Sequence, residues 1–329
     1  MSSVFAHLHT HSKYSIQDGL VDPQALMKRC NDYGMSSVAV SDHGNIAGVW
    51  ECSKYAKKYG INLIPGCEMY LVPDGVKCRG KDWGKGKSCH IVLLAADKEG
   101  WQNILLLTAY ANTTGFYHEP RIDLQTLEKY FKGLFCLSGC LGGWLGKAFF
   151  RGDSVALAAD RLHQIFGDRF SLEIQLNGLQ EQVDFNAALI EVHKTSSIPL
   201  VATVDAHYLE KSDSHKQDLL FALQLDNLLD DPKRLKLPER QHSVEAPNEV
   251  ISKFVAMYGR YGQSAIDRTV EIAENCKANV ETESKDYKIP SYDVYTSPDF
   301  NEFQLWLGKQ CSCHSTNGEC LIHKNCKGD

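Results

Sequence analysis

The stretch His7-Leu8-His9-Thr10-His11 carries the strongest fold signal in this chain. Every second residue in it is a histidine, and alternate side chains of an extended strand point to the same face. We therefore expect His7, His9 and His11 to line one face, where imidazole is the commonest metal-binding side chain. The alternative is three solvated histidines near a mobile terminus, although apolar Val4-Phe5-Ala6 precedes them. One strand cannot close a metal site, so the rest of the chain must supply partners.

Short apolar runs alternate with helical patterns along most of the remaining chain. The runs that indicate strands lie at 37–40, 62–71, 90–96, 134–137, 170–176 and 199–204. The patterns with helical spacing lie at 23–33, 46–59, 99–110, 154–166 and 181–194. Repeated strand-then-helix units predict parallel strands, and about seven of them favour a barrel over an open sheet.

Polar residues fall where the strand runs end. The residues that directly follow such runs are His43, Cys140, Asp205 and His207, and those inside or at the edge of a run are Glu68 and His90. The carboxyl ends of strands in a βα barrel converge on one face, where catalysis is housed. One such residue alone is more often a cap or a satisfied polar group. The whole set predicts a single pocket.

Composition limits the class of protein. The 329 residues suffice for one large α/β domain or two ordinary ones. The net charge of -6 gives no global basic field, so any DNA contact requires a local patch. No apolar run approaches a membrane span and no signal peptide is evident, which predicts a cytoplasmic protein without a membrane partner. Among the twelve cysteines, Cys30, Cys52 and Cys136 have apolar neighbours and are expected in the core.

Five motifs resemble successive motifs of the PHP (polymerase and histidinol phosphatase) domain family. They are His9-Thr10-His11, Ser41-Asp42-His43-Gly44-Asn45, Gly66-Cys67-Glu68, Ser138-Gly139-Cys140 and Asp205-Ala206-His207-Tyr208. The resemblance is greatest to the amino-terminal PHP domain of bacterial DNA polymerase III alpha subunits. The segments typical of that branch are Gly115-Phe116-Tyr117, Pro120-Arg121-Ile122-Asp123 and Thr269-Val270-Glu271-Ile272-Ala273-Glu274. The resemblance implies an α/β fold, a distorted (β/α)7 TIM-like barrel with its metal site at the carboxyl ends of the strands.

The resemblance also implies the ligands of two to three divalent ions. The family's ligand positions fall on His9, His11, Asp18, His43, Glu68, His90, Cys140, Asp205 and His207. The first ion would be held by His9, His11, Glu68 and Asp205; the second by Glu68, His90 and Cys140; the third by Asp18, His43 and His207. The expected catalytic residues are His9, His11, Glu68, Asp205 and His207. These donors suit zinc, manganese or iron.

The activity that the resemblance implies is metal-dependent phosphoester hydrolysis, as a 3′–5′ exonuclease acting on DNA in replication. Its expected partners are DNA and replication proteins such as a polymerase core or clamp. No polymerase palm is expected in this chain. Two alternatives stay open: a small-molecule phosphatase of the histidinol-phosphate type, and a non-catalytic docking module of the replisome.

Four residues are candidate substrate contacts. His7 is expected behind the ligands or against substrate. Arg121 could bind a phosphate bidentately, or merely pair with Asp123. Lys85 and Lys87 belong to a basic, glycine-rich loop that could track DNA phosphates, with a solvated surface loop as the alternative. The other members of this loop are Lys77, Arg79, Lys81 and Trp83.

Three segments are expected along the chain. Residues 1–285 would form the PHP domain, 286–310 a partial polymerase-like lead-in, and 311–329 a tail rich in Cys and His. The tail could chelate zinc or be a disordered end. Its candidate ligands are Cys311, Cys313, His314, Cys320, His323 and Cys326.

Overall fold

A computed structural model describes residues 4–16, 18–79, 88–231, 233–234, 236 and 241–280. All of them lie in one compact unit, Met1–Glu281. The expectations for Lys81, Trp83, Lys85, Lys87 and the segments 286–310 and 311–329 concern positions outside the described residues.

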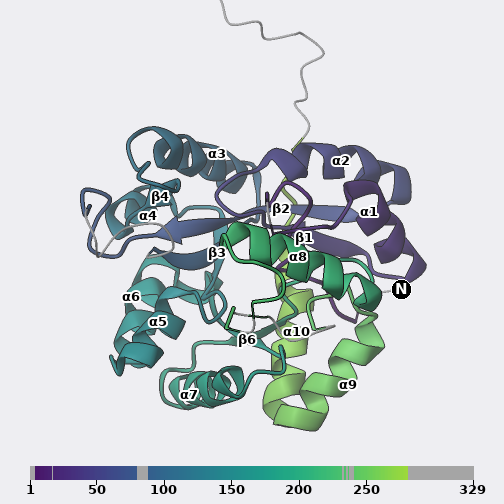
Figure 1. Cartoon of the computed structure of the whole chain (residues 1–329). Coiled ribbons are helices and arrows are strands. Elements are labelled where there is room, and N and C mark those ends of the chain that lie inside the picture. Colours follow the sequence, from purple (N-terminus) through teal and green to yellow (C-terminus); the bar gives the residue numbers. More distant parts are fainter. Residues whose placement is uncertain are drawn as a thin grey trace, which may run out of the picture. The chain divides into compact units, whose positions relative to one another are not determined.

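A single curled sheet forms the centre of this unit (Figure 1). Its strands are β1 (Ser37–Val40), β2 (Asn62–Leu71), β3 (Cys89–Ala95), β4 (Arg121–Ile122), β5 (Leu134–Leu137), β6 (Phe170–Gln175) and β7 (Leu200–Thr203). They follow the order β1-β2-β3-β5-β6-β7, and β4 pairs with β2.

The expectation of uniformly parallel strands was wrong for β3, which is antiparallel to both β2 and β5. A parallel pair needs a crossover connection, usually a helix, whereas the described residues between β2 and β3 form no helix. The other pairings, from β1·β2 to β6·β7, are parallel.

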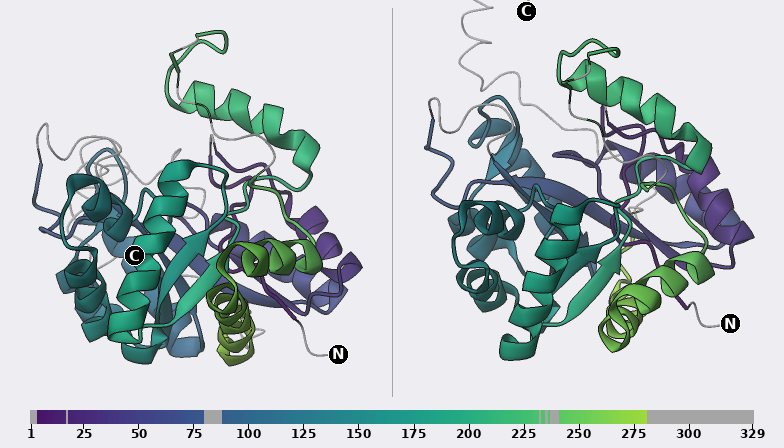
Figure 2. Two further views of the ribbon diagram at one scale, coloured as in Figure 1. Left: turned by 90° about the horizontal axis from the view of Figure 1, so that it is seen from below. Right: turned by 60° about the horizontal axis from the view of Figure 1, so that its bottom comes forward.

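Helices surround the curled sheet, and one of them, α8 (Ser214–Gln224), stands apart from the sheet at one end of it (Figures 1 and 2). They are α1 (Pro23–Asp32), α2 (Ala47–Tyr59), α3 (Lys98–Thr113), α4 (Leu124–Tyr130), α5 (Trp144–Arg151), α6 (Val155–Phe166), α7 (Gln180–Ser196), α8 (Ser214–Gln224), α9 (Pro247–Tyr258) and α10 (Arg260–Asn275), with short 3₁₀ turns at Gly167–Arg169 and Lys211–Asp213. The start of α1 shows why the sequence pattern worked, because the Asp22 carboxylate caps the helix and Pro23 opens it. No helix of the described part has the length and hydropathy needed to cross a membrane.

The segment that precedes α1 joins the two ends of the sheet. His7 bridges to Val38 in β1, and Thr10 bridges to Ala206 just after β7. Ala6 and Leu8 of this segment pack in an interior cluster with Val92, Leu137 and Val201, which come from three strands of the sheet. The segment thereby closes the sheet into a distorted TIM-like barrel, and the expected fold class is confirmed.

The three cysteines with apolar neighbours in the sequence lie in the core. Cys30, Cys52 and Cys136 are wholly buried in the core, as expected. Every cysteine of the described residues is a free thiol.

Candidate metal centre

Nine polar side chains from distant parts of the sequence meet at one end of the barrel. His9, His11 and Asp18 come from the closing segment, and the others lie in or after the strands β1, β2, β3, β5 and β7. His90 stands at the beginning of its strand rather than at the end. It still reaches this rim because β3 runs antiparallel to its neighbours, so its first residues lie beside the last residues of β2.

Four of these side chains bring one donor atom each to within 3.4 Å of the Nε2 atoms of His9 and His11. The Nε2 atoms of His9 and His11 are 3.0 Å apart. Glu68 Oε2 lies 3.4 Å from the first nitrogen and 3.2 Å from the second, and Asp205 Oδ1 lies 3.3 and 3.2 Å from them. Donors about 2.0–2.2 Å from a tetrahedral ion are separated by roughly 3.3–3.6 Å. The separations of 3.0–3.4 Å between the two imidazole nitrogens, and from them to the two carboxylates, are close to those of donors that share one ion.

Several of these buried atoms make no hydrogen bond with the described residues. They are both carboxylate oxygens of Glu68, Asp205 Oδ1, His43 Nδ1 and His90 Nδ1. Burying a polar atom without a partner is costly, and a folded protein rarely leaves several such atoms together. Divalent cations bound among these atoms would satisfy their lone pairs, so the residues present fit metal ions.

Glu68 connects these four donors to a second group. Its Oε1 lies 3.1 Å from His90 Nδ1. Cys140 stands next to His90: a Cβ placed on Gly142 would lie 3.4 Å from His90 Nδ1 and 3.5 Å from Cys140 Sγ. The glycine thus leaves a small space between a thiol and an imidazole.

Asp18, His43 and His207 form a third group. Asp18 Oδ2 is 2.8 Å from His43 Nε2 and 3.3 Å from His207 Nε2. The His11 ring stacks between the other two imidazoles, at centroid distances of 4.2 and 4.4 Å. Helix α8 also contacts this group, because its Gln217 Nε2 lies 3.4 Å from Asp18 Oδ1.

The charges in the cluster depend on one another. Burial alone would raise the pKa of the Glu68 carboxyl, but the imidazoles of His43, His90 and His9 hold it well below its usual value. Burial and the carboxylates of Asp205 and Glu68 raise the pKa of the Cys140 thiol. A bound cation would reverse this last effect, because a coordinating thiol is deprotonated.

Three residues that support the imidazoles were missed in the sequence. Glu173, wholly buried in β6, accepts a hydrogen bond from His9 Nδ1 at 2.7 Å. His11 Nδ1 is 2.9 Å from Ser15 Oγ, and this hydroxyl donates to Asp42 Oδ1 at 3.0 Å. A glutamate inside the apolar run 170–176 was a signal that could have been noticed.

His242 was missed as well. Its donor atoms form a further close group with Asp205 and His207, and its Nδ1 lies 3.1 Å from the backbone oxygen of Asp205. Nothing in the local sequence distinguishes this histidine. Asp205 itself takes a left-handed backbone conformation, with φ of 55°.

The expectation that His7 shares a face with His9 and His11 was wrong. Ala6 and Leu8 occupy the barrel interior, so His7 points away from it, and a bend at His9 redirects the chain. His7 is wholly buried, and its Nε2 is 2.9 Å from the backbone oxygen of Glu245.

Arg121 is also buried, with 1% of its surface exposed. Its guanidinium donates to the backbone oxygens of Gly115, Cys78 and Val76 at 3.2, 3.0 and 2.8 Å. The expected alternative, a pair with Asp123, is not formed, because that carboxylate accepts hydrogen bonds from Val76 and Thr126.

Fold and donor cluster together define the class of protein: a βα barrel with a cluster of candidate metal ligands at one rim. The family model of the PHP domain matches residues 7–177, more than half of the chain. The chain belongs to the PHP domain family.

Two curated relatives and one solved structure illustrate this likeness. DNA polymerase III subunit alpha of Thermus aquaticus is 37% identical over 297 residues, which cover 88% of this chain and 24% of the relative. The corresponding subunit of Borreliella burgdorferi is 31% identical and covers 99% of this chain and 27% of the relative. A two-domain protein of Bacteroides vulgatus, described as containing a predicted PHP-like metal-dependent phosphoesterase, is 16% identical, with a TM-score of 0.39 over 62% of this chain and 52% of that one.

The chain thus spans about a quarter of the length of the polymerase subunits that it matches. In class it is a PHP domain related to DNA polymerase III alpha subunits.

Proposed function

We propose that this chain is a metal-dependent phosphodiesterase that removes nucleotides from the 3′ end of DNA. The observation that carries the proposal is the buried cluster of His9, His11, Glu68 and Asp205. Its oxygens Glu68 Oε1, Glu68 Oε2 and Asp205 Oδ1 make no hydrogen bond with the described residues. The second and third ligand groups adjoin this cluster through Glu68 and the stacked His11 ring.

The proposed ligands are the nine expected from the sequence: His9, His11, Asp18, His43, Glu68, His90, Cys140, Asp205 and His207. Zinc, manganese or iron ions held by them would neutralise phosphoryl oxygens and lower the pKa of a water molecule. We propose that the site holds two to three ions, since the donors form three groups.

The protein's own contribution is to fix the imidazoles. Glu173 accepts from His9 Nδ1 at 2.7 Å, and the Asp205 backbone oxygen lies 2.8 Å from His207 Nδ1. Ser15 contacts the same nitrogen of His11 at 2.9 Å. With Nδ1 engaged, each ring presents the lone pair of Nε2 to the centre of the cluster.

The relation to DNA polymerase III alpha subunits supports DNA as the substrate and replication proteins, such as a polymerase core or clamp, as partners. Lys77 and Arg79 are exposed on the segment that follows β2, the strand of Glu68. Cations there could track the phosphates of a strand that enters the site.

The test uses the full chain, loaded with manganese or zinc, and an Asp205→Asn control. Single-stranded DNA labelled at the 3′ or the 5′ end is offered beside histidinol phosphate. We expect nucleotides released stepwise from the 3′ end by the wild type and not by the control. Cleavage of histidinol phosphate alone would instead indicate a small-molecule phosphatase. Cleavage of neither substrate, with metal content confirmed, would overturn the proposed activity and leave a docking role.

A further inference from the structure

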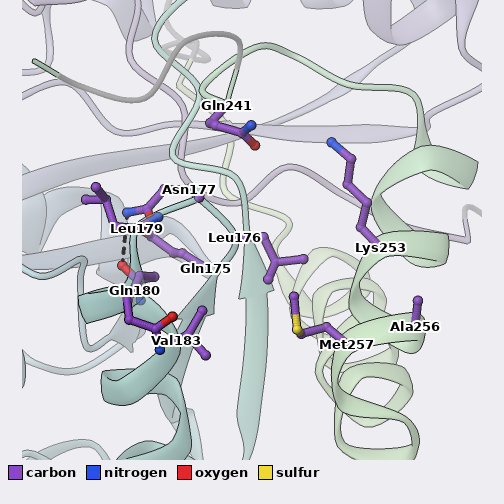
Figure 3. A pocket seen from close by; sticks show the side chains of 12 residues that line it. Gln175, Leu176, Asn177, Leu179, Gln180, Val183, Gln241, Lys253, Ala256 and Met257 are labelled. Carbon is purple, nitrogen blue, oxygen red and sulfur yellow. Dashed lines mark hydrogen bonds between the residues drawn. The ribbon is translucent and has the colours of Figure 1, made fainter.

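The two imidazoles proposed for the first ion are held by different kinds of group. Glu173 accepts from His9, and beside it Gln175 donates to the same carboxylate and borders a cavity of about 450 Å³ between the end of β6 and α9 (Figure 3). His11 contacts instead the hydroxyl of Ser15, which is 1% exposed. A hydroxyl can both donate and accept, so by itself it fixes no tautomer of the imidazole. The other partners of this hydroxyl decide its role.

One of these partners is the carboxylate of Asp42, which is 1% exposed and is not among the nine proposed ligands. Its Oδ1 accepts hydrogen bonds from Ser15 Oγ at 3.0 Å and from the backbone N–H of Ser12 at 2.6 Å. Its Oδ2 accepts from Ser12 Oγ at 2.8 Å. Because a carboxylate oxygen that already faces a backbone N–H can only accept, the single hydrogen of the Ser15 hydroxyl points at Asp42.

The hydrogen bonds of Ser15 then leave one choice for His11. The hydroxyl hydrogen is donated to Asp42, and one lone pair of the oxygen accepts the backbone N–H of His43 at 3.1 Å. The second lone pair faces His11 Nδ1 at 2.9 Å and requires a hydrogen opposite it. A neutral imidazole carries one hydrogen, so Nδ1 keeps it and Nε2 is left with a free lone pair.

We propose that Asp42 is a positioning residue of the metal centre, which fixes through the Ser15 hydroxyl the tautomer of His11 that can bind an ion at Nε2. The inference rests on the metal centre of the proposed function. Without this carboxylate the Ser15 hydrogen would turn to His11 Nδ1. The ring would then carry its hydrogen on Nε2, and this nitrogen would have to lose the hydrogen before it could bind an ion.

The test is a double-mutant cycle on the full chain, in which zinc affinity is measured by competition with a chromogenic chelator. Asp42→Ala leaves the Ser15 hydroxyl free to donate to His11, so we expect zinc affinity to fall by about tenfold or more. Ser15→Ala removes this competing donor. Added to Asp42→Ala, it should raise the affinity again by about threefold or more, which is the effect of one hydrogen bond. Structural damage from two truncations would instead make the double variant the weakest binder.

Two further variants keep the test decisive if Asp42→Ala does not fold. Asp42→Asn retains an oxygen at the Oδ1 position, because the backbone N–H of Ser12 requires an acceptor there, and should weaken zinc binding by less than about threefold. Ser15→Ala in the wild-type background removes the acceptor of the His11 hydrogen and should weaken binding by about threefold or more.

The matched control is Asp123, another buried carboxylate that accepts the hydroxyl of a neighbour, Thr126. In the described part of the chain, no imidazole contacts this second hydroxyl. Asp123→Ala should therefore lower the free energy of unfolding, measured with urea in EDTA, and leave the zinc affinity unchanged.

A double variant that binds zinc no better than Asp42→Ala would overturn the inference, as would a Ser15→Ala variant with the affinity of the wild type. A wild type that binds no zinc would overturn both the inference and the proposed function. The expected cycle in a chain that hydrolyses no DNA would support the inference and contradict the proposed function. DNA hydrolysis by a chain in which the double variant is the weakest binder would do the reverse.

Discussion

The Nε2 atoms of His9 and His11 lie 3.0 Å apart, while each ring engages its Nδ1 with a different partner, Glu173 and Ser15. Two imidazoles fixed in this way direct their lone pairs at the same point. One carboxylate oxygen of Glu68 and one of Asp205 each lie 3.2 Å from His11 Nε2. A cation at this position would hold the four groups together.

Removing one of the convergent charges should empty the first ion site. We expect Asp205→Asn to weaken binding of the tightest ion by roughly a hundredfold or more, since loss of a supporting partner alone costs ten- to a hundredfold. Competition with a chromogenic chelator measures this. Asp184→Asn, on the exposed side of α7, is the control. Unchanged affinity in Asp205→Asn would remove this residue from the ligand set.

Glu173 should act on the ion through His9 rather than by contact. Glu173→Gln keeps the shape of the side chain but weakens its hold on the Nδ1 hydrogen, so we expect a ten- to about a hundredfold loss in metal affinity. The control is Glu191→Gln at an exposed position of α7, which should leave the metal affinity unchanged. If both variants bind metal with the affinity of the wild type, Glu173 has no effect on the ion and only contributes hydrogen bonds to the barrel interior.

Metal should stabilise the folded chain. An ion that binds only the native state, present at a hundred times its Kd, adds about 2.7 kcal/mol to the free energy of unfolding. Thermal denaturation with increasing zinc or manganese should therefore show a rising Tm, and EDTA should abolish the rise. This cluster is not the metal site if the Tm of the wild type does not change with the ion, or if the Tm of Asp205→Asn rises equally.

His7 should contribute to acid sensitivity. Burial lowers its pKa from 6.5 to about 4, against the opposing effect of the hydrogen bond to Glu245. The unfolded chain therefore takes up this proton first as the pH falls, so stability decreases from about pH 6.5 to about pH 4, by about 3 kcal/mol at most. Urea denaturation across this range, with EDTA present, should show a shallower pH dependence in His7→Gln than in the wild type. Parallel curves would contradict this role.

Arg121 should matter for stability. Arg121→Met leaves three buried backbone oxygens without their donors, and we expect a loss of about 2–4 kcal/mol. Arg161→Met breaks an exposed pair with Glu128 and should cost less than about 1 kcal/mol. Denaturant titration compares them. A fully stable Arg121→Met with a raised KM for DNA would instead restore the expected phosphate contact.

The sequence predicted the barrel and the convergence of the strand ends because both depend on local patterns. Hydrophobic runs marked the strands, and the polar residues after them, such as His43 and Asp205, had to meet at one rim. The reversed direction of β3 was not predictable in this way, since no periodic pattern distinguishes an antiparallel strand from a parallel one. The sequence still placed His90 among the donors by resemblance, and the reversal explains how it reaches them.

The missed residues depend on contacts between distant elements. Glu173 and His242 reach the cluster only after β6 and the residues before α9 take their places. His7 was misplaced because strict alternation fails at the bend near His9. Arg121 looked free for a phosphate, yet the loops around Val76 and Gly115 fold onto it.

The most direct test of the metal centre is anomalous diffraction from crystals of the full chain grown with manganese or zinc. The account predicts an anomalous peak enclosed by His9, His11, Glu68 and Asp205, about 2.0–2.3 Å from the nearest donor atoms. Further peaks are expected beside His90 with Cys140, and beside Asp18 with His43. Well-ordered side chains at these positions without any anomalous peak among them, in crystals that hold the ion elsewhere, would contradict the account.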